Sequence, residues 1–178
     1  MSEAAQRTTR VDLGDRSYDV VTGADLLGSL GERARGLCGG AARAYVVIDD
    51  NLPKPLVQTA IDALRAAGFE TGTQQVRALE SNKVPATVER ILLGLTASRL
   101  ERSLVVVALG GGIVGDAAGF AAAVYKRGVP VIQCPTSLLA MVDASVGGKT
   151  GVNLQSPDGL LKNLVGAFWQ PTLVLADI

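Results

Sequence analysis

A run of glycines near the middle of the chain has the spacing of a dinucleotide-binding turn. Residues 110–116 read GGGIVGD and satisfy the pattern G-x-G-x-x-G. They directly follow an apolar segment of strand type (104–109) and open a small-residue segment of helical type (116–126). Glycines in such a turn let backbone N–H groups approach a pyrophosphate, and the helix N-terminus adds partial positive charge. This context favours a nucleotide site, although glycines at such a turn can also serve packing alone.

The acidic residue that would bind a ribose is missing from its usual place. A Rossmann unit carries it about 20 positions after the glycines, where this chain has Gln133, Cys134 and no carboxylate. Asp49 and Asn51 are the candidates instead, because they follow the β-rich run AYVVI (44–48) and open α/β sheets bind ligands at that end of their strands. A turn or helix cap of the Asx type explains the same spacing equally well.

A second group of polar residues follows the next strand-like segment. Asp143 lies in the apolar stretch LLAMVDASV, and Lys149 follows six residues later, beyond two glycines that can bend the chain back. A carboxylate and an ammonium that converge there would suit a polar substrate, whereas the pattern alone slightly favours a surface helix end. The run GGKT (147–150) resembles the end of a P-loop, but Asp143 stands where that pattern needs glycine, so the ATPase interpretation fails. Thr136 and Ser137 are either ligand hydroxyls or a helix N-cap.

Composition excludes several classes of protein. The 178 residues carry 17 basic and 17 acidic side chains, and this zero net charge argues against a nucleic-acid partner. The absence of His excludes a Ser-His-Asp or Cys-His triad and any His-ligated metal site within the chain. The two cysteines, Cys38 and Cys134, fit reduced thiols in a cytoplasmic protein. Since no apolar run approaches the roughly 20 residues that cross a bilayer, we expect no membrane partner.

The elements that must position these residues alternate along the chain. We expect a β-hairpin from 10–13 and 18–22, strands at 44–48, 70–77, 104–109, 129–134 and 173–176, and helices at 24–37, 56–67, 84–99, 116–126 and 137–146. This order predicts an α/β fold of Rossmann-like, doubly wound type, with a mostly parallel sheet and an N-terminal hairpin. Residues 153–159 (NLQSPDG) are expected to form a surface loop. Because the sequence stops just after an apolar strand, we expect it to be part of a larger protein or a natural truncation.

The motifs together resemble a known family. Residues 110–153, with KNLVGAFWQP at 162–171, closely resemble the 3-dehydroquinate synthases, which belong to the sugar-phosphate cyclases. The shorter runs IDDN (48–51) and LESNK (79–83) match earlier landmarks of that family. The resemblance implies that residues 1–178 form an NAD-binding N-terminal domain. It also implies a helical, metal-binding C-terminal domain that is absent from this chain, with the active site between the two domains.

Family roles carry over to individual positions by this resemblance. It implies dinucleotide contacts at Asp49, Asn51, Glu80, Lys83, Gly110, Gly111, Gly112, Ile113, Asp116, Thr136, Ser137, Leu139, Asp143, Lys149 and Lys162. It implies substrate or catalytic contacts at Asp143, Lys149, Asn163 and Arg127. Arg127, which by pattern alone is a solvated helix end, resembles an arginine that reaches the substrate phosphate of the neighbouring subunit, so a homodimer is implied.

The resemblance also implies a reaction. The family converts 3-deoxy-D-arabino-heptulosonate 7-phosphate to 3-dehydroquinate and phosphate, with transient oxidation of one carbinol by NAD. A divalent metal, zinc or cobalt, polarises that carbinol, and its ligands, one Glu and two His, would lie beyond residue 178. We therefore expect this chain alone to bind NAD weakly and to be inactive. The alternatives are a cyclase that acts on sedoheptulose 7-phosphate or an amino-sugar substrate, and a non-catalytic dinucleotide-binding module.

Two features depart from the family pattern. Leu79 stands where the family usually has glycine, before the Glu-x-x-Lys motif formed by Glu80 and Lys83. The segment between Lys149 and Lys162 is longer than in the family, so the placement of Lys162 and Asn163 depends on how that segment folds.

Overall fold

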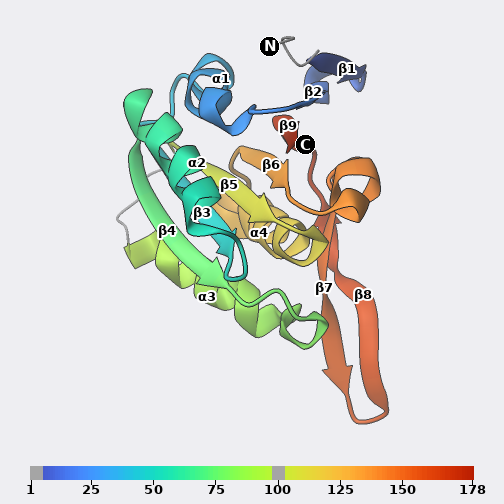
Figure 1. Ribbon diagram of the computed structural model, residues 1–178. Helices are drawn as coiled ribbons and strands as arrows, with labels where there is room; N and C mark the ends of the chain where they lie inside the picture. Colours follow the sequence, from blue (N-terminus) through green and yellow to red (C-terminus); the bar gives the residue numbers. More distant parts are fainter. Residues whose placement is uncertain (1–5, 98–102) are drawn as a thin grey trace.

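The structure, a computed structural model that describes residues 6–97 and 103–178, is built around one mixed sheet (Figure 1). The strand order is β1-β2-β9-β6-β5-β3-β4, and only the β1–β2 pair is antiparallel. The strands are β1 (Arg7–Val11), β2 (Tyr18–Gly23), β3 (Arg43–Asp49), β4 (Glu70–Val76), β5 (Leu104–Gly110), β6 (Val131–Pro135) and β9 (Leu173–Asp177). The predicted α/β fold with a mostly parallel sheet and an N-terminal hairpin is therefore confirmed.

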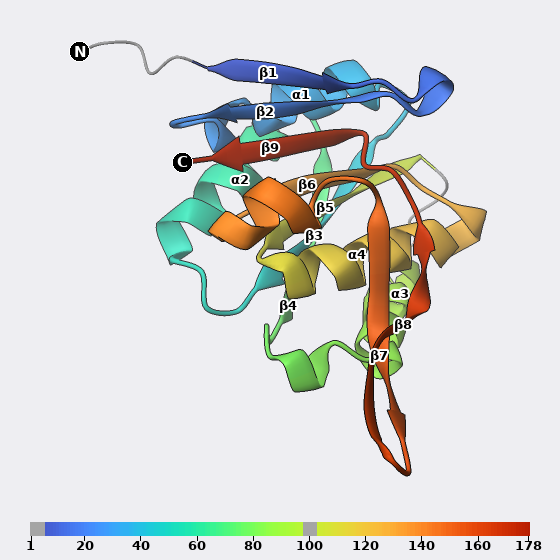
Figure 2. The ribbon, with the colours of Figure 1, turned by 90° about the vertical axis from the view of Figure 1, so that its right-hand side faces the viewer.

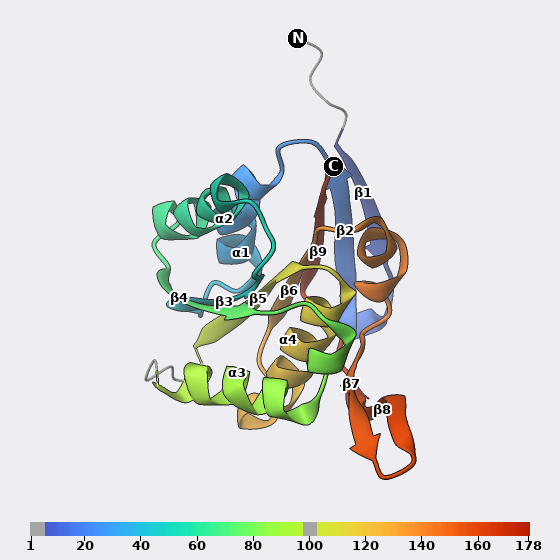
Figure 3. The same ribbon diagram turned by 60° about the horizontal axis from the view of Figure 1, so that its bottom comes forward.

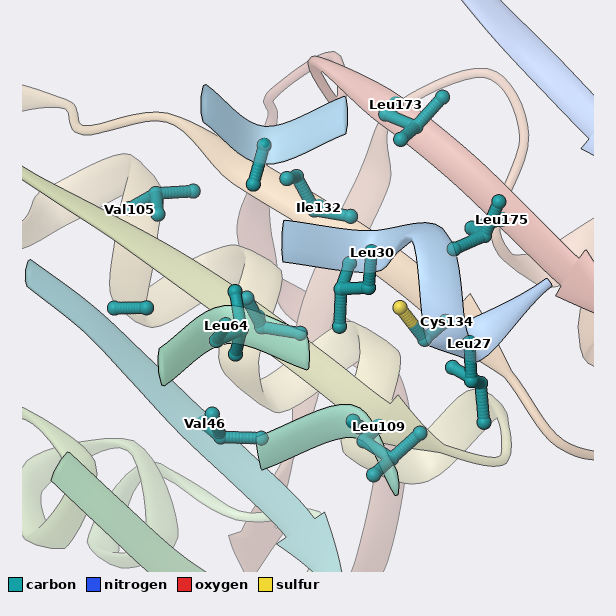
Figure 4. Close-up of a cluster of buried hydrophobic side chains, with 14 of the residues drawn as sticks. Leu27, Leu30, Val46, Leu64, Val105, Leu109, Ile132, Cys134, Leu173 and Leu175 are labelled. Atoms are coloured by element: carbon teal, nitrogen blue, oxygen red, sulfur yellow. The ribbon is translucent and has the colours of Figure 1, made fainter. Parts of the chain in front are cut away.

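Helices cover both faces of this sheet (Figure 3). On one face lie α1 (Leu30–Leu37) and α2 (Lys54–Ala66), and on the other lie α3 (Pro85–Ala97) and α4 (Gly112–Val124). Every residue of β5 is buried because helices pack on both of its faces, as its uninterrupted apolar sequence predicts. One apolar core joins β5 to α1 and α2 through residues such as Leu30, Leu64 and Leu109 (Figure 4). A second core joins β5 to α3 and α4.

Several helix boundaries differ from those predicted. The helix expected at 24–37 begins with a 3-10 turn (Leu27–Ser29), and α1 follows it, since Asp25 has a φ of 57° that an α-helix cannot accommodate. The helix expected at 116–126 begins earlier, at Gly112, and ends at Val124. The turn η4 (Tyr125–Arg127) follows it with left-handed φ values at Lys126 and Arg127, and the segment expected at 137–146 has π-helical geometry in η5 (Ala140–Ala144).

The loop predicted at 153–159 is wrong. Residues 149–168 form a second, two-stranded antiparallel sheet, β7 (Lys149–Ser156) and β8 (Gly159–Phe168), joined by a turn at Pro157 and Asp158. Figure 2 shows this hairpin projecting from the body of the molecule. Two glycines face each other across it, and a Cβ on Gly166 would lie 2.0 Å from the carbonyl oxygen of Thr150. The prediction failed because turn-forming residues cluster in this segment and no apolar alternation marks its strands.

Candidate functional site

The glycine turn lies where the sheet changes its winding direction. The chain leaves β3 for β4 on one side and then returns to β5 on the other, so the carboxyl ends of β3 and β5 form the switch point at which open α/β sheets bind ligands. Gly110 ends β5, and a Cβ added to it would lie 2.8 Å from Cβ of Val114 and 3.0 Å from Cβ of Asp49. Gly111 precedes α4 without any side-chain cap. Backbone N–H groups of the first turn of α4 can therefore bind an anion.

Asp49 and Asn51 lie beside this turn, as predicted. Asp49 Oδ1 accepts hydrogen bonds from the backbone nitrogen of Asn51 at 3.0 Å and from its Nδ2 at 3.1 Å. The Asx-type turn that the spacing also allowed is thus confirmed. A carboxylate has lone pairs on both oxygens, so this turn leaves acceptors for a ribose hydroxyl, and that role stays a prediction.

The residues after β6 reach the same edge of the sheet. Leu109 and Gly110 of β5 pair with Cys134 and Pro135 of β6, and the backbone nitrogen of Thr136 donates to the carbonyl oxygen of Gly110 at 3.0 Å. Ser137 Oγ lies 3.4 Å from the position that a Cβ on Gly111 would take. The hydroxyl of Ser137 therefore lies against the glycine turn, where a phosphate would bind. Leu139, two residues further on, is 69% exposed.

A buried lysine connects three separate parts of the chain. Lys83, 6% exposed, follows the short helix η3 (Glu80–Asn82). Its Nζ pairs with the carboxylate of Asp116 on α4 and donates to Oδ1 of Asn163 on β8 at 2.6 Å. Burial raises the pKa of Asp116, the hydrogen bond and charge of Lys83 oppose that rise, and the negative charges of Glu80 and Asp143 add to it. The Lys83 ammonium is therefore the group that favours the ionised form of Asp116.

Glu80 adds a half-exposed carboxylate to this group. Its Oε1 accepts a hydrogen bond from Nδ2 of Asn153 at 2.9 Å and lies 4.0 Å from Nζ of Lys162. Leu79, which replaces a family glycine, has φ −106° and ψ 143°. This is an extended conformation that any residue adopts, so the turn does not need glycine.

A cavity of about 570 Å³ lies between α4, η5 and the β7–β8 hairpin. Four of the predicted site residues line it: Asp116, Asp143, Lys149 and Asn163. The bend between Asp143 and Lys149 is made by Gly147 and Gly148, whose φ values are +87° and +67°. Asp143 and Lys149 therefore line the same cavity, but both side chains are exposed, as the alternative of a surface helix end also allows, so their convergence on a substrate stays a prediction. The remaining lining residues are Ala144, Val146, Thr150, Gly151, Leu164, Gly166, Ala167 and Phe168.

Comparison with known proteins identifies the family to which this arrangement belongs. The family described as 3-dehydroquinate synthase N-terminal matches residues 73–178, more than half of the chain. The chain belongs to this family. A 3-dehydroquinate synthase of Bradyrhizobium diazoefficiens (strain USDA 110) is 52% identical over 167 residues, which are 94% of this chain and 42% of that relative. The chain thus spans less than half the length of this relative.

Two solved structures share the fold of this 3-dehydroquinate synthase family member. A 2-deoxy-scyllo-inosose synthase complexed with carbaglucose-6-phosphate, NAD+ and Co2+ matches with a TM-score of 0.84 at 28% identity, over 96% of this chain and 46% of that one. A 2-epi-5-epi-valiolone synthase of Streptomyces hygroscopicus with NAD+ and Zn2+ bound matches with a TM-score of 0.75 at 31% identity, over 96% of this chain and 45% of that one.

One predicted site residue of the 3-dehydroquinate synthase pattern lies apart from the others. Arg127 is exposed and follows the C-terminal end of α4, whereas the glycine turn lies at the N-terminal end, about 20 Å away along a helix of this length. Arg127 is not among the residues that line the cavity. The side chain of Trp169 packs on the adjacent Gly128 and donates from Nε1 to the carbonyl oxygen of Val129 at 3.0 Å. The role of Arg127 in a neighbouring subunit stays a prediction.

Asn153 is the residue of this site that sequence reasoning missed. It is fully buried and contacts both Glu80 and Asn163, but it falls in the segment predicted as a loop. The only signal was an asparagine directly after the small and apolar residues TGV in a segment that resembles the family.

Neither a metal cluster nor a membrane-spanning helix is found in the described part of the chain. No group of three or more metal-ligating side chains could hold an ion within residues 6–97 and 103–178. Over the same ranges, no helix has both the length and the apolar character required to span a membrane.

Proposed function

We propose that this chain is the NAD-binding domain of a 3-dehydroquinate synthase, which converts 3-deoxy-D-arabino-heptulosonate 7-phosphate to 3-dehydroquinate and phosphate in the cytoplasm. One observation carries the proposal. Residues from α4, η5 and the hairpin, far apart in the sequence, line one cavity, and Lys83, which follows η3, contacts two of them. The predicted site residues that line it are Asp116, Asp143, Lys149 and Asn163, and Glu80 joins this group through its hydrogen bond to Asn153.

The residues present fit NAD. The turn at Gly110, Gly111, Gly112 and Ile113 offers uncapped backbone donors for the diphosphate, because Gly111 at the N-cap has no side chain to accept from them. Gly110 is required beside it, since a Cβ there would clash with Val114. Asp49 and Asn51 bind the adenosine ribose at the adjacent strand end, and Thr136, Ser137 and Leu139 complete the dinucleotide contacts. Bound NAD supplies a transient hydride acceptor for one substrate carbinol. Glu80 and Lys83 then hold the dinucleotide on the hairpin side, with Lys162 beside Glu80.

The cavity fits the substrate. Its volume of about 570 Å³ falls in the range of about 300–1,000 Å³ typical of small-molecule sites. Lys149 offers an ammonium to the phosphate or carboxylate of a sugar phosphate, and Asn163 offers an amide to its hydroxyl groups. Asp143, exposed on η5, accepts hydrogen bonds from hydroxyl groups at the same cavity. Arg127 contacts the substrate phosphate of a second copy, so the complete protein is a homodimer.

The metal that the family uses does not fit the described residues, because they contain no cluster of three ligating side chains.

Identity favours the 3-dehydroquinate reaction over the other cyclase reactions. The chain is 52% identical to a named 3-dehydroquinate synthase, against 28% and 31% to the two other cyclases. The test is a phosphate-release assay of the intact gene product with catalytic NAD and a divalent metal. Release from 3-deoxy-D-arabino-heptulosonate 7-phosphate is expected. Release from sedoheptulose 7-phosphate instead would overturn the substrate, and NAD binding without any turnover would favour a non-catalytic module.

A further inference from the structure

Asn153 is a fully buried polar side chain whose hydrogen bonds all go to residues of the proposed site. Its backbone nitrogen donates to the carbonyl oxygen of Lys83 at 2.8 Å. Its Oδ1 accepts from the backbone nitrogen of Asn163 at 2.9 Å, and its Nδ2 donates to Oε1 of Glu80 at 2.9 Å and, more weakly, to the carbonyl oxygen of Glu80 at 3.4 Å. One amide group thus joins the hairpin to η3.

The hairpin is irregular at this residue. Val152 pairs with Val165 and Leu154 pairs with Leu161, so the ladder shifts register around Asn153. The side-chain oxygen of Asn153 accepts a hydrogen bond from the backbone N–H of Asn163, in the place of a backbone carbonyl of the paired strand. Asn163 is held there with a φ of 52°, in the left-handed region that non-glycine residues seldom adopt. In this conformation Asn163 Oδ1 accepts the hydrogen bond from Lys83 Nζ at 2.6 Å.

We propose that Asn153 is a positioning residue of the dinucleotide site. Its amide holds the Glu80 carboxylate on one side and the Asn163 backbone on the other, and through Asn163 it sets the direction of the Lys83 ammonium. The inference rests on the proposed function, because Glu80 and Lys83 matter here as NAD contacts. Asparagine is required since one end of its amide donates to a carboxylate while the other end accepts from an N–H group.

Asn153→Asp tests this with an almost isosteric change. Aspartate still accepts the hydrogen bond from the backbone of Asn163, but it places a second carboxylate against that of Glu80. The other charged groups nearby are Lys162 of β8, whose Nζ lies 4.0 Å from Glu80 Oε1, and the Lys83–Asp116 pair, which lies on the far side of Asn163. At pH 8 the dissociation constant for NAD, measured by calorimetry on the intact gene product, is expected to rise about tenfold. Two adjacent carboxylates take up a proton as the pH falls, which restores a hydrogen bond between them. The difference from wild type is expected to shrink to about twofold at pH 5.5.

A second variant reverses the hydrogen bond. In Glu80→Gln/Asn153→Asp, the new glutamine amide donates to the new carboxylate, so affinity at pH 8 is expected to return to within about threefold of Glu80→Gln alone. Gln155→Glu is the matched control, because it adds the same charge to an exposed position of the same strand and is expected to leave NAD affinity unchanged. Circular dichroism at each pH verifies the folded fraction.

The outcomes separate the two proposals. Wild type that fails to bind NAD overturns the proposed function and this inference with it. Wild type that binds while Asn153→Asp matches it at pH 8, or loses affinity equally at every pH, overturns the inference alone. If Asn153→Asp does not fold, the double variant decides: recovery to the affinity of Glu80→Gln supports the positioning role, and a loss of about tenfold relative to Glu80→Gln contradicts it.

Discussion

The central sheet and the β7–β8 hairpin are stabilised in opposite ways. All residues of β5 are buried, and apolar contacts with helices on both faces hold the strand in place. The hairpin contributes Val152 to the second core but exposes most of its large apolar side chains, with Leu164 61% and Phe168 77% exposed, and it buries the polar Asn153. The sheet therefore presents a rigid backbone edge, the glycine turn, whereas the hairpin presents side chains whose direction depends on a few polar contacts.

The largest effect is expected from the apolar core of the sheet. Leu109→Ala removes a fully buried side chain next to the glycine turn and should lower the free energy of unfolding by about 2–5 kcal/mol. Leu164→Ala, the same change on the hairpin, should shift it by less than about 0.5 kcal/mol. Urea denaturation of both variants measures this contrast. Equal losses would show that the hairpin is as tightly packed as the sheet.

The next effect concerns the ionic contact between Lys83 and Asp116 of α4, which lies beside the hydrogen bond from Lys83 to Asn163 of the hairpin. Lys83→Met leaves the partly buried Asp116, whose side chain is 17% exposed, without its cation and should cost about 3 kcal/mol at pH 7.5. Because burial already raises the pKa of Asp116, loss of the opposing Lys83 charge raises it further. A carboxyl group whose pKa is raised in the folded state binds more protons there than in the unfolded chain. The stabilisation that this group contributes to the protein is therefore lost as the pH rises through its folded-state pKa.

The deficit of Lys83→Met relative to wild type should therefore grow between pH 4 and pH 7.5, as denaturation at several pH values would show. The matched variant Lys83→Met/Asp116→Asn has no carboxyl to titrate and should lose this extra pH dependence. A deficit that stays constant with pH would mean that Lys83 acts through packing rather than charge.

A smaller effect is expected where the hairpin packs on α4. A Cβ on Gly119 would lie 2.5 Å from Cγ2 of Thr150, so Gly119→Ala should destabilise the protein by about 1–2 kcal/mol despite the better helix propensity of alanine. Thr150→Ser removes that methyl group and keeps the hydroxyl that donates to the carbonyl oxygen of Ala167 at 2.8 Å. In the Thr150→Ser background, Gly119→Ala should cost far less. A double-mutant cycle of unfolding free energies with no coupling between the two positions would contradict the close approach.

The same contrast explains which parts could be predicted from the sequence. The strands of the sheet and the glycine turn carry local signals, because burial on two faces requires continuous apolar runs and the turn requires glycine. Asp49 could be placed beside Gly110 because the carboxyl ends of parallel strands meet at one edge of the sheet. The hairpin gives no such signal, since it exposes leucines and buries Asn153. Asn153 contacts Glu80, 73 positions away, and that pairing depends on the completed fold rather than on any local pattern.

The smallest effect returns to the sheet and to Cys134 of β6. Burial raises the pKa of this thiol from 9.0 to about 12, and the negative charge of Asp177 adds to the rise. The folded state therefore keeps its proton where the unfolded chain loses it, so stability falls as pH rises from about 9 toward 12. At pH 10 the loss from this group should be about 1 kcal/mol. Cys134→Ala is less stable at every pH, but its unfolding free energy should fall less steeply above pH 9 than that of wild type. Parallel slopes for the two proteins would mean that solvent reaches the thiol, and that the sheet next to the glycine turn is as open as the hairpin.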